Sequence, residues 1–291
     1  MLSAGGEAGA AWTAPYPCAM TFSIVARSAD GESWGVAVAS KFLAVGSVVP
    51  AAVAGLGALA VQAEPDVSWK GLGLSMLDEG ATAQVALDRL LADDDRPDDR
   101  QVAIVDHEGG AAAYTGAGCF DWAGHRVGEG VTVQGNVLTG PEVLDAMLGS
   151  WDATADEPEL ATRLLAALSA GDRAGGDRRG RQSAALLVVR EEAGYGGMDD
   201  VAVDLRVDEH RDPCTELARL LELNRIYLTA STEEERVPLD GDLRAELEGL
   251  ARAAGHPDLA TFVGFENYEM RADLDSDPGW VDQLVVRVLR G

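Results

Sequence analysis

The sequence predicts an α+β fold in which two stacked antiparallel sheets carry helices on their outer faces. Two observations support this prediction: β-hairpin patterns recur along residues 20–212, and pairs of helical segments stand between the hairpins. A third observation concerns residues 213–291, where apolar residues recur at helical spacing and no strand pattern is evident. We therefore expect a large layered domain over residues 20–212 and a small all-α C-terminal domain over residues 213–291.

The predicted elements follow one another at short intervals. An Asp30-Gly31 turn joins the first two strands, because this dipeptide readily adopts positive φ. Gly80 breaks the first helical stretch, and the acidic run 93–99 ends it. In chain order we predict strands over 21–28, 34–40 and 56–62, helices over 70–92, strands over 101–105, 111–115 and 130–137, helices over 141–150 and 157–170, and strands over 183–190 and 201–207.

Residues 213–291 differ in character from the rest of the chain. Apolar positions at helical spacing occur at 217–223, 243–250, 259–262 and 281–289, and a charged loop is expected over 231–240. Residues 1–19 are rich in Ala, Gly and Pro without periodicity, so we expect a flexible N-terminal arm there.

Composition and charge limit the classes of function. Of the 291 residues 47% are hydrophobic, which is enough for a sizeable core. The chain carries 49 acidic and 23 basic residues, a formal charge of −26. A nucleic-acid backbone or an anionic membrane would be repelled by this charge. We therefore expect a small-molecule substrate and neither a nucleic-acid nor a membrane partner.

Cysteine usage and segment hydropathy bear on the compartment. The three cysteines are widely spaced and form no Cys-x-x-Cys pair, which argues against a disulfide framework and a zinc site. The N-terminal stretch lacks the basic start and continuous apolar run of a secretory signal, and no run of 18 apolar residues occurs elsewhere. We expect a cytoplasmic protein.

Thr21 is the first candidate catalytic residue. It stands at the head of a predicted strand directly after Met20, and a terminal threonine carries its own base, because its α-amine has a reference pKa near ~7.7–8.0. Such an amine can accept the hydroxyl proton and activate the oxygen as a nucleophile. The alternative is an ordinary strand residue that follows a 20-residue extension.

Ser40 and Lys41 end the second predicted strand. Antiparallel pairing places this end beside Thr21, where a buried ammonium would hold the threonine hydroxyl and lower a neighbouring pKa. The alternative is a lysine at a strand end whose ammonium reaches solvent.

The stretch 175–183 is a glycine-rich bend with three arginines and Asp177. Glycines let the backbone approach a ligand closely, and arginine binds carboxylates in a bidentate manner. A solvated basic turn is the alternative. Gln134-Gly135-Asn136 offers amide donors of the kind that stabilise an oxyanion, although a lone motif of this kind is weakly specific.

Other titratable residues carry weaker signals. His125 has no acidic partner at a recognisable spacing, and Cys119 lacks a basic environment. The clusters at 106–108 and 208–210 lie at strand ends, where neighbouring side chains face opposite sides, so we interpret them as solvated turns. We expect no metal and no cofactor.

Three long segments in order resemble the family called domain of unknown function 1028. They are TFSIVARSADGESWGVAVASKFLAVGSVVP, DWAGHRVGEGVTVQGNVL, and GGDRRGRQSAALLVV with the following VDLRVDEH. The resemblance covers residues 20–213 and implies a four-layer αββα sandwich of the N-terminal nucleophile (Ntn) hydrolase superfamily. It also implies a homo-oligomer, since members of this superfamily commonly associate.

The resemblance implies roles for individual residues. Thr21 would be the nucleophile, and Asn136 would match the strand-end asparagine of an oxyanion hole. The catalytic residues expected on this basis are Thr21, Lys41, Asn136 and Asp177. The substrate-binding residues expected are Ser40, Gln62, Arg178, Arg181 and Gln182. We accordingly expect an amide-bond hydrolase acting on a small anionic amide or peptide-like compound.

Two further interpretations remain open at the level of sequence. Because residues 1–20 precede Thr21, a non-catalytic ligand-binding or scaffold protein of the same fold is an alternative. The tail from residue 212 onward is similar to a peptidoglycan-binding helical module that is often attached to this family. A helical cap or an oligomer interface is the alternative interpretation of these amphipathic helices.

Overall fold

The structure is a computed structural model that describes residues 21–291. The expected N-terminal arm lies outside the described residues. The strands are β1 Thr21–Arg27, β2 Ser33–Ser40, β3 Pro50–Val53, β4 Gly57–Ala63, β5 Arg100–Asp106, β6 Ala111–Thr115, β7 Gly124–Gly128, β8 Val131–Asn136, β9 Ser183–Arg190, β10 Val201–Val207, β11 Arg236–Leu239, β12 Ala272–Asp273 and β13 Gly279–Asp282. The helices are α1 Trp69–Asp78, α2 Ala83–Ala92, α3 Glu142–Ala153, α4 Leu160–Arg173, α5 Pro213–Tyr227, α6 Gly241–Ala253, α7 Leu259–Phe265 and α8 Gln283–Arg290.

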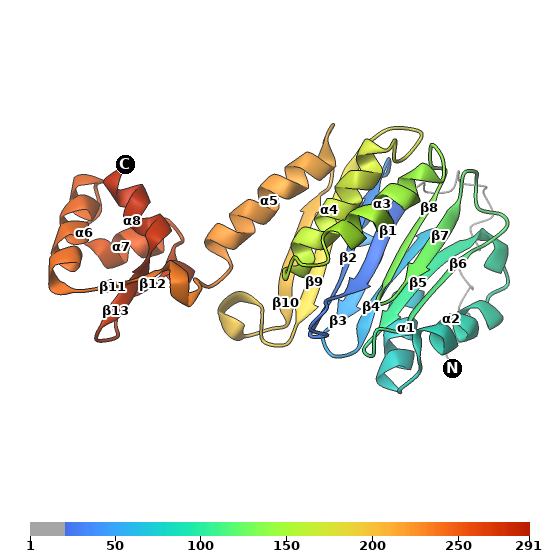
Figure 1. Cartoon of the computed structure of the whole chain (residues 1–291), viewed down its shortest axis with the longest axis horizontal. Helices are drawn as coiled ribbons and strands as arrows, with labels where there is room; N and C mark the ends of the chain where they lie inside the picture. The colour runs from blue at the N-terminus through green and yellow to red at the C-terminus, as the bar shows by residue number, and fades with distance from the viewer. Residues whose placement is uncertain (1–20) are drawn as a thin grey trace, which may run out of the picture.

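The large domain contains the two stacked antiparallel sheets that the sequence predicts. One sheet has six strands in the order β10-β9-β2-β1-β8-β7, and the other has four in the order β3-β4-β5-β6. Helices α3 and α4 cover the outer face of the six-stranded sheet, and α1 and α2 cover the outer face of the four-stranded sheet (Figure 1). The layer order is therefore αββα, as expected.

Alternation along β1 shows how the sequence specifies these layers. Phe22 and Ile24 belong to the core beneath α3 and α4, whereas Val25 belongs to the core between the sheets. Because successive side chains of a strand face opposite sides, Thr21 and Ser23 also face the space between the sheets. We call the face that β1 turns toward the other sheet its inner face.

Two strands of the large domain, β3 and β7, are not predicted from the sequence. Strand β3 has four residues and begins with Pro50, and β7 is bounded by Gly124 and Gly128. Both lie at sheet edges, where proline and glycine are tolerated. Neither shows enough alternation to be recognised as a strand from sequence.

The C-terminal segment corrects the expectation of an all-α domain. Strands β11, β12 and β13 form a three-stranded antiparallel sheet that packs with α6, α7 and α8 around a separate apolar core. These strands have two to four residues, too few to show a period of two. Pro238 is accommodated because β11 lies at the edge of its sheet.

Helix α5 joins the two parts of the molecule. Its residues Cys214, Leu217 and Leu221 belong to the core of the six-stranded sheet, so this first helix of the expected C-terminal domain packs on the large domain. The small C-terminal unit lies beyond the far end of α5 (Figure 1). None of the helices within residues 21–291 has the length and apolar character needed to cross a membrane.

Candidate active site

Thr21 begins the central strand β1 between two other polar strand ends. It pairs with Ser40 of β2 on one side and with Asn136 of β8 on the other. All three side chains face the other sheet, and Thr21 is only 1% exposed. The Thr21 hydroxyl donates to Ser40 Oγ at 3.3 Å. The structure therefore brings together the three strand-end residues that the sequence analysis selected.

A buried polar cluster surrounds this position between the sheets. Every member is at most 2% exposed, although polar side chains are seldom fully buried without partners. The cluster consists of Thr21, Ser23, Ser40, Gln62, Gln101, Gln134 and Asn136. Farther along the same space most facing residues are apolar, for example Val25 and Val36, and Thr132 of β8 is the buried polar side chain opposite Val25. Polar character between the sheets is thus concentrated at the end where β1 begins.

Gln101 of β5 connects the two sheets within the cluster. Its Nε2 donates to the main-chain oxygens of Gly124 and Gly135 at 3.1 and 2.8 Å. Its Oε1 accepts from Gln62 Nε2 at 2.7 Å and from Asn136 Nδ2 at 2.9 Å. Gln101 therefore fixes the orientation of both amides that lie near Thr21.

Gln62 reaches Thr21 directly and also extends the cluster inward. Its Nε2 lies 3.4 Å from the Thr21 carbonyl oxygen. Its Oε1 accepts from Ser23 Oγ at 2.7 Å, and Ser23 in turn accepts from Gln134 Nε2 at 2.6 Å. The expected substrate-binding residue Gln62 is therefore a buried neighbour of the proposed nucleophile.

Lys41 lies differently from the expectation. Its side chain is exposed and its ammonium donates to the Arg181 carbonyl oxygen at 3.3 Å. Of the two interpretations of the sequence, the buried ammonium beside the threonine hydroxyl is not observed, since the hydroxyl is bonded to Ser40, and the alternative of an ammonium that reaches solvent is the one the structure has. A lysine at a strand end exposes its charged group because removing it from water is costly.

The glycine-rich loop spans the end of β1. Arg178 N donates to Val137 O beside β8, while Gln182 N donates to Ser40 O of β2. Asp177 is buried, and its carboxylate accepts from Lys41 N at 2.7 Å and from the Arg179 guanidinium at 3.1 Å. Asp177 thereby holds the loop against Lys41, the residue that directly follows Ser40 at the end of β2.

Backbone conformation explains the glycines of this loop. Gly175 and Gly176 have φ values of 126° and 51°, which L side chains rarely adopt. A Cβ on Gly175 would also lie 2.3 Å from Thr139 Oγ1. The loop thus needs glycine for its own fold.

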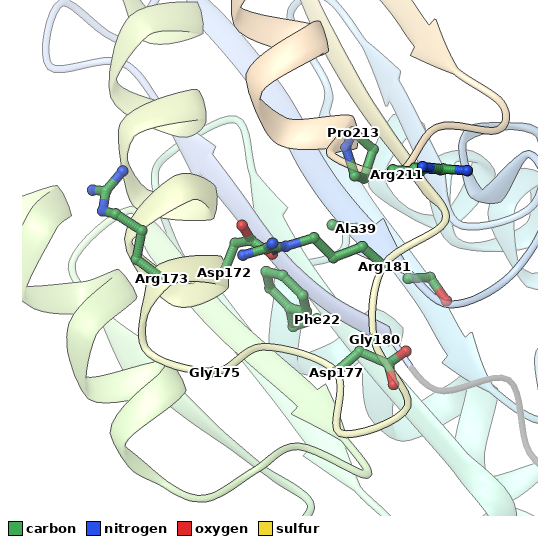
Figure 2. A pocket seen from close by; sticks show the side chains of 11 residues that line it. Phe22, Ala39, Asp172, Arg173, Gly175, Asp177, Gly180, Arg181, Arg211 and Pro213 are labelled. Atoms are coloured by element: carbon green, nitrogen blue, oxygen red, sulfur yellow. Dashed lines mark hydrogen bonds and ion pairs between the residues drawn. The ribbon is translucent and has the colours of Figure 1, made fainter.

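The arginines of the loop already have partners. Arg178 donates to Asp121 O at 2.8 Å, and Arg181 pairs with Asp172 at 2.7 Å. Arg181 borders a cavity of about 370 Å³ on the helix-covered face of the sheet, and it extends toward Asp172 beside Phe22 (Figure 2). The Thr21 hydroxyl lies on the opposite, inner face, so these arginines and Thr21 do not converge in one cavity.

His125 and Cys119 lie at the edge of the cluster. His125 Nδ1 is 2.9 Å from Thr115 Oγ1, which accepts a hydrogen bond from Gln101 Nε2. Because that oxygen accepts from Gln101, its own hydrogen can be donated to a neutral imidazole. Burial raises the pKa of the Cys119 thiol to about 11, which makes this residue a poor nucleophile.

Because of His125, the free energy of unfolding is expected to be smaller at mildly acidic pH than at neutral pH. Burial lowers the pKa of His125, and the adjacent Arg126 charge acts in the same direction. The unfolded chain therefore binds the proton more readily, so this contribution to stability is present above about pH 6.5 and is lost as the pH falls below it. Urea denaturation at about pH 7.5 and about pH 5.5 measures the loss.

The matched variants for this test are His125→Gln and His107→Gln, because His107 is exposed. The first should flatten the pH dependence relative to the unmodified protein, and the second should leave it unchanged. Equal pH dependence in all three proteins would contradict the role given to His125.

Three members of the cluster are not predicted from the sequence: Ser23, Gln101 and the side chain of Gln134 as an internal partner. All three occupy inward positions of their strands, and on β5 the other inward positions, Ala103 and Val105, are apolar. A polar residue at a predicted inward position was the available signal. Their mutual contacts depend on how the two sheets stack, which a strand pattern does not contain.

Comparison with known proteins identifies the family. The model of a family of unknown function, DUF1028, matches residues 21–217. A crystal structure of a protein from Silicibacter pomeroyi assigned to the same family model is 32% identical, with a TM-score of 0.64, and the similarity covers 71% of this chain and 86% of that one. No curated protein matches the chain. The chain therefore belongs to the DUF1028 family, as the three sequence segments indicated.

Proposed function

We propose that the protein is an Ntn-type amidohydrolase that cleaves a small amide or peptide-like compound with Thr21 as nucleophile. The observation that carries this proposal is the place of Thr21, at the head of a central strand, hydrogen bonded to Ser40 and surrounded by buried amides. The αββα layer order supports membership of the Ntn hydrolase superfamily.

The proposed reaction needs Thr21 as the first residue of the working chain. Its α-amine then accepts the hydroxyl proton while Oγ1 attacks the amide carbon of the substrate. The C–N bond breaks, the leaving amine takes the proton back, and a water molecule later hydrolyses the ester. Asn136 Nδ2 carries a second hydrogen besides the one donated to Gln101, and this hydrogen is assigned to the oxyanion.

An anionic group on the substrate stays a prediction. It depends on Arg178 and Arg181, whose guanidinium groups already bond to Asp121 and Asp172. A substrate anion would have to compete with these partners. Roles for Lys41, Asp177 and Gln182 likewise remain predictions, since their hydrogen bonds hold the loop that spans the end of β1.

Mass spectrometry of the purified protein tests the proposal in two steps. The mature chain is expected to begin at Thr21, and incubation with a reactive β-lactone should add one lactone mass to the peptide that starts with this residue. Ring opening forms an ester with Oγ1 and breaks the ring C–O bond, so the whole probe is retained. A mature chain that keeps residues 1–20, or a terminal peptide that stays unlabelled, favours the non-catalytic ligand-binding alternative.

A further inference from the structure

The hydrogen bonds around Gln101 have a fixed direction. Gly124 O and Gly135 O are main-chain carbonyl oxygens, which can only accept. The Gln101 nitrogen must therefore face them, and its oxygen must face Gln62 and Asn136. Because an oxygen accepts, both of these neighbours turn an amide nitrogen toward Gln101.

This direction leaves the Asn136 oxygen without a partner. Asn136 Oδ1 is buried and makes no hydrogen bond with any residue of the described range 21–291, and the side chain as a whole is 0% exposed. A buried acceptor without a donor is destabilising, because it has lost the hydrogen bonds that water would supply. Rotating the amide would set this oxygen against Gln101 Oε1, which cannot donate, and would also break the bond from Asn136 Nδ2, so the amide stays as it is.

The unpartnered oxygen lies beside the proposed nucleophile. Asn136 and Thr21 are direct partners in the antiparallel pairing of β8 and β1, and both face the other sheet. The Cβ atoms of such a pair are about 4.5–5.5 Å apart. A group that donates to Asn136 Oδ1 is therefore held next to the Thr21 hydroxyl.

The surroundings favour a neutral donor. Ser23, Gln62, Gln101 and Gln134 carry no charge, and within residues 21–291 none of these four side chains is hydrogen bonded to a carboxylate. A substrate ammonium placed here would lose its hydration and would stand beside the Thr21 α-amine, which itself becomes positive when it takes the hydroxyl proton, whereas an amide N–H costs much less to bury.

We propose that Asn136 Oδ1 binds an amide N–H of the substrate beside Thr21, and that Gln101 is the positioning residue that keeps this oxygen available. The inference rests on the proposed function and specifies its substrate as one that presents an N–H next to the bond to be cleaved. Asn136 then contacts the substrate through two atoms: Oδ1 accepts from the amide N–H, and Nδ2 donates to the oxyanion.

An NMR titration of the ¹⁵N-labelled full chain tests this inference without any covalent step. The probes are propionamide and N,N-dimethylpropionamide, which share a carbonyl but differ in their N–H groups. The Asn136 side-chain amide signal is assigned by its absence in Asn136→Leu. Propionamide should shift this signal and bind at least about ten-fold more tightly than the dimethyl compound. Equal binding of the two probes, or no shift with either, overturns the inference.

Gln101→Met provides the test of positioning. The preference for propionamide should fall toward unity in this variant, because the Asn136 amide is no longer oriented, while Gln84→Met on an exposed helix face should keep the full preference. The ratio is measured within each protein, so a general loss of stability does not produce it. An unchanged ratio in Gln101→Met removes the role of Gln101. Failure of lactone labelling with an intact ratio would reject the hydrolase proposal alone, and the reverse result would reject this inference alone.

Discussion

Replacing Thr21 with alanine is expected to abolish β-lactone labelling of the terminal peptide, a loss of about 10³-fold or more in the rate of acylation. The alanine variant keeps the α-amine and the strand pairing with Ser40 and Asn136 but lacks the oxygen that attacks. Thr21→Ser retains a hydroxyl in the same place and should retain labelling. Time-resolved mass spectrometry of the intact protein measures all three rates.

Stability separates a chemical effect from a structural one in this experiment. Thr21 is buried, yet alanine removes only a hydroxyl and one methyl group, so the melting temperature should fall by no more than a few degrees. Ser40→Ala is the matched control, because it removes a neighbouring buried hydroxyl without removing the nucleophile. Labelling of Thr21→Ala at the rate of the unmodified protein would show that another residue is acylated and would reject Thr21 as nucleophile.

The pairing of Thr21 with Ser40 could be predicted from the local sequence, whereas its pairing with Asn136 could not. The Asp30-Gly31 hairpin predicts that Ser40 lies beside Thr21, and the register confirms it. The hairpin is a local structure whose pairing follows from its turn. Asn136 lies more than a hundred residues away, and its place beside Thr21 came from a resemblance to a known family.

The glycine-rich loop illustrates a second limit. Its three arginines predict an anion site, because a sequence shows charges but not which carboxylates fold against them. In the structure Asp172 and Asp177 take two of these guanidinium groups, and Arg178 takes a main-chain oxygen. Asp172 belongs to α4, so this pairing depends on where that helix ends relative to the loop.

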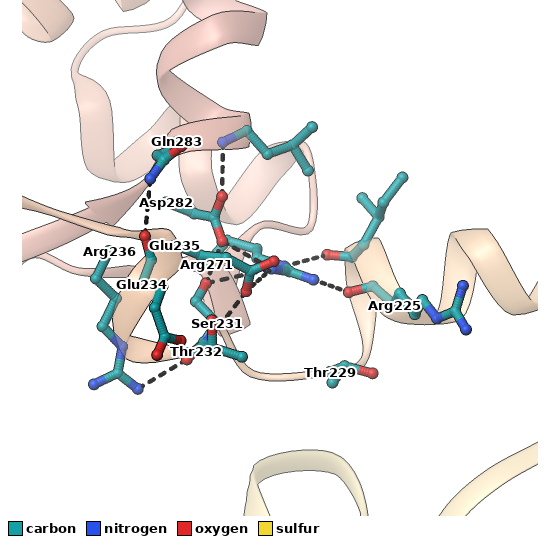
Figure 3. Close-up of polar contacts among 12 residues, drawn as sticks. Arg225, Thr229, Ser231, Thr232, Glu234, Glu235, Arg236, Arg271, Asp282 and Gln283 are labelled. Atoms are coloured by element: carbon teal, nitrogen blue, oxygen red, sulfur yellow. Dashed lines mark hydrogen bonds and ion pairs between the residues drawn. The ribbon is translucent and has the colours of Figure 1, made fainter. Parts of the chain in front are cut away.

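The C-terminal unit contains a buried arginine that the sequence analysis did not single out. Arg271 and Asp282 have side chains only 7% and 3% exposed, and they form an ion pair at 2.7 Å. Arg271 also donates to the carbonyl oxygens of Arg225 and Ile226 in the last turn of α5 (Figure 3). Asp282 accepts from Ser231 Oγ and from Leu284 N at the start of α8.

These contacts explain the ionisation of Asp282. Burial acts to raise the pKa of its carboxyl group, but hydrogen bonds from Ser231, Leu284 N and Arg271 outweigh burial and lower it. The folded protein therefore stabilises the charged form of the Asp282 carboxylate. Its contribution to stability is present above the unfolded pKa of about 3.9 and is lost as the pH falls below that value.

Replacing Asp282 with alanine is expected to lower the free energy of unfolding of the C-terminal unit by about 3 kcal/mol, because it leaves the buried Arg271 charge with only the half-exposed Glu235, at 3.2 Å, as a counter-ion. Urea denaturation followed by tryptophan fluorescence measures the change, since Trp280 lies on β13 of the same unit. Glu246→Gln is the control, because Glu246 pairs with Arg290 at the exposed surface and its loss should leave the unfolding curve unchanged.

A double variant distinguishes an unpaired charge from a general loss of packing. Arg271→Met combined with Asp282→Leu removes both charges and keeps apolar volume, so it should be more stable than Asp282→Ala alone. The double variant should still weaken the contact between α5 and the C-terminal unit, because the carbonyl oxygens of Arg225 and Ile226 lose their donor. Faster hydrogen exchange at the last turn of α5 in the double variant would report this loss. If the double variant is no more stable than Asp282→Ala, the loss in Asp282→Ala comes from packing and not from the unpaired Arg271 charge, and the role given to the Arg271–Asp282 ion pair is wrong.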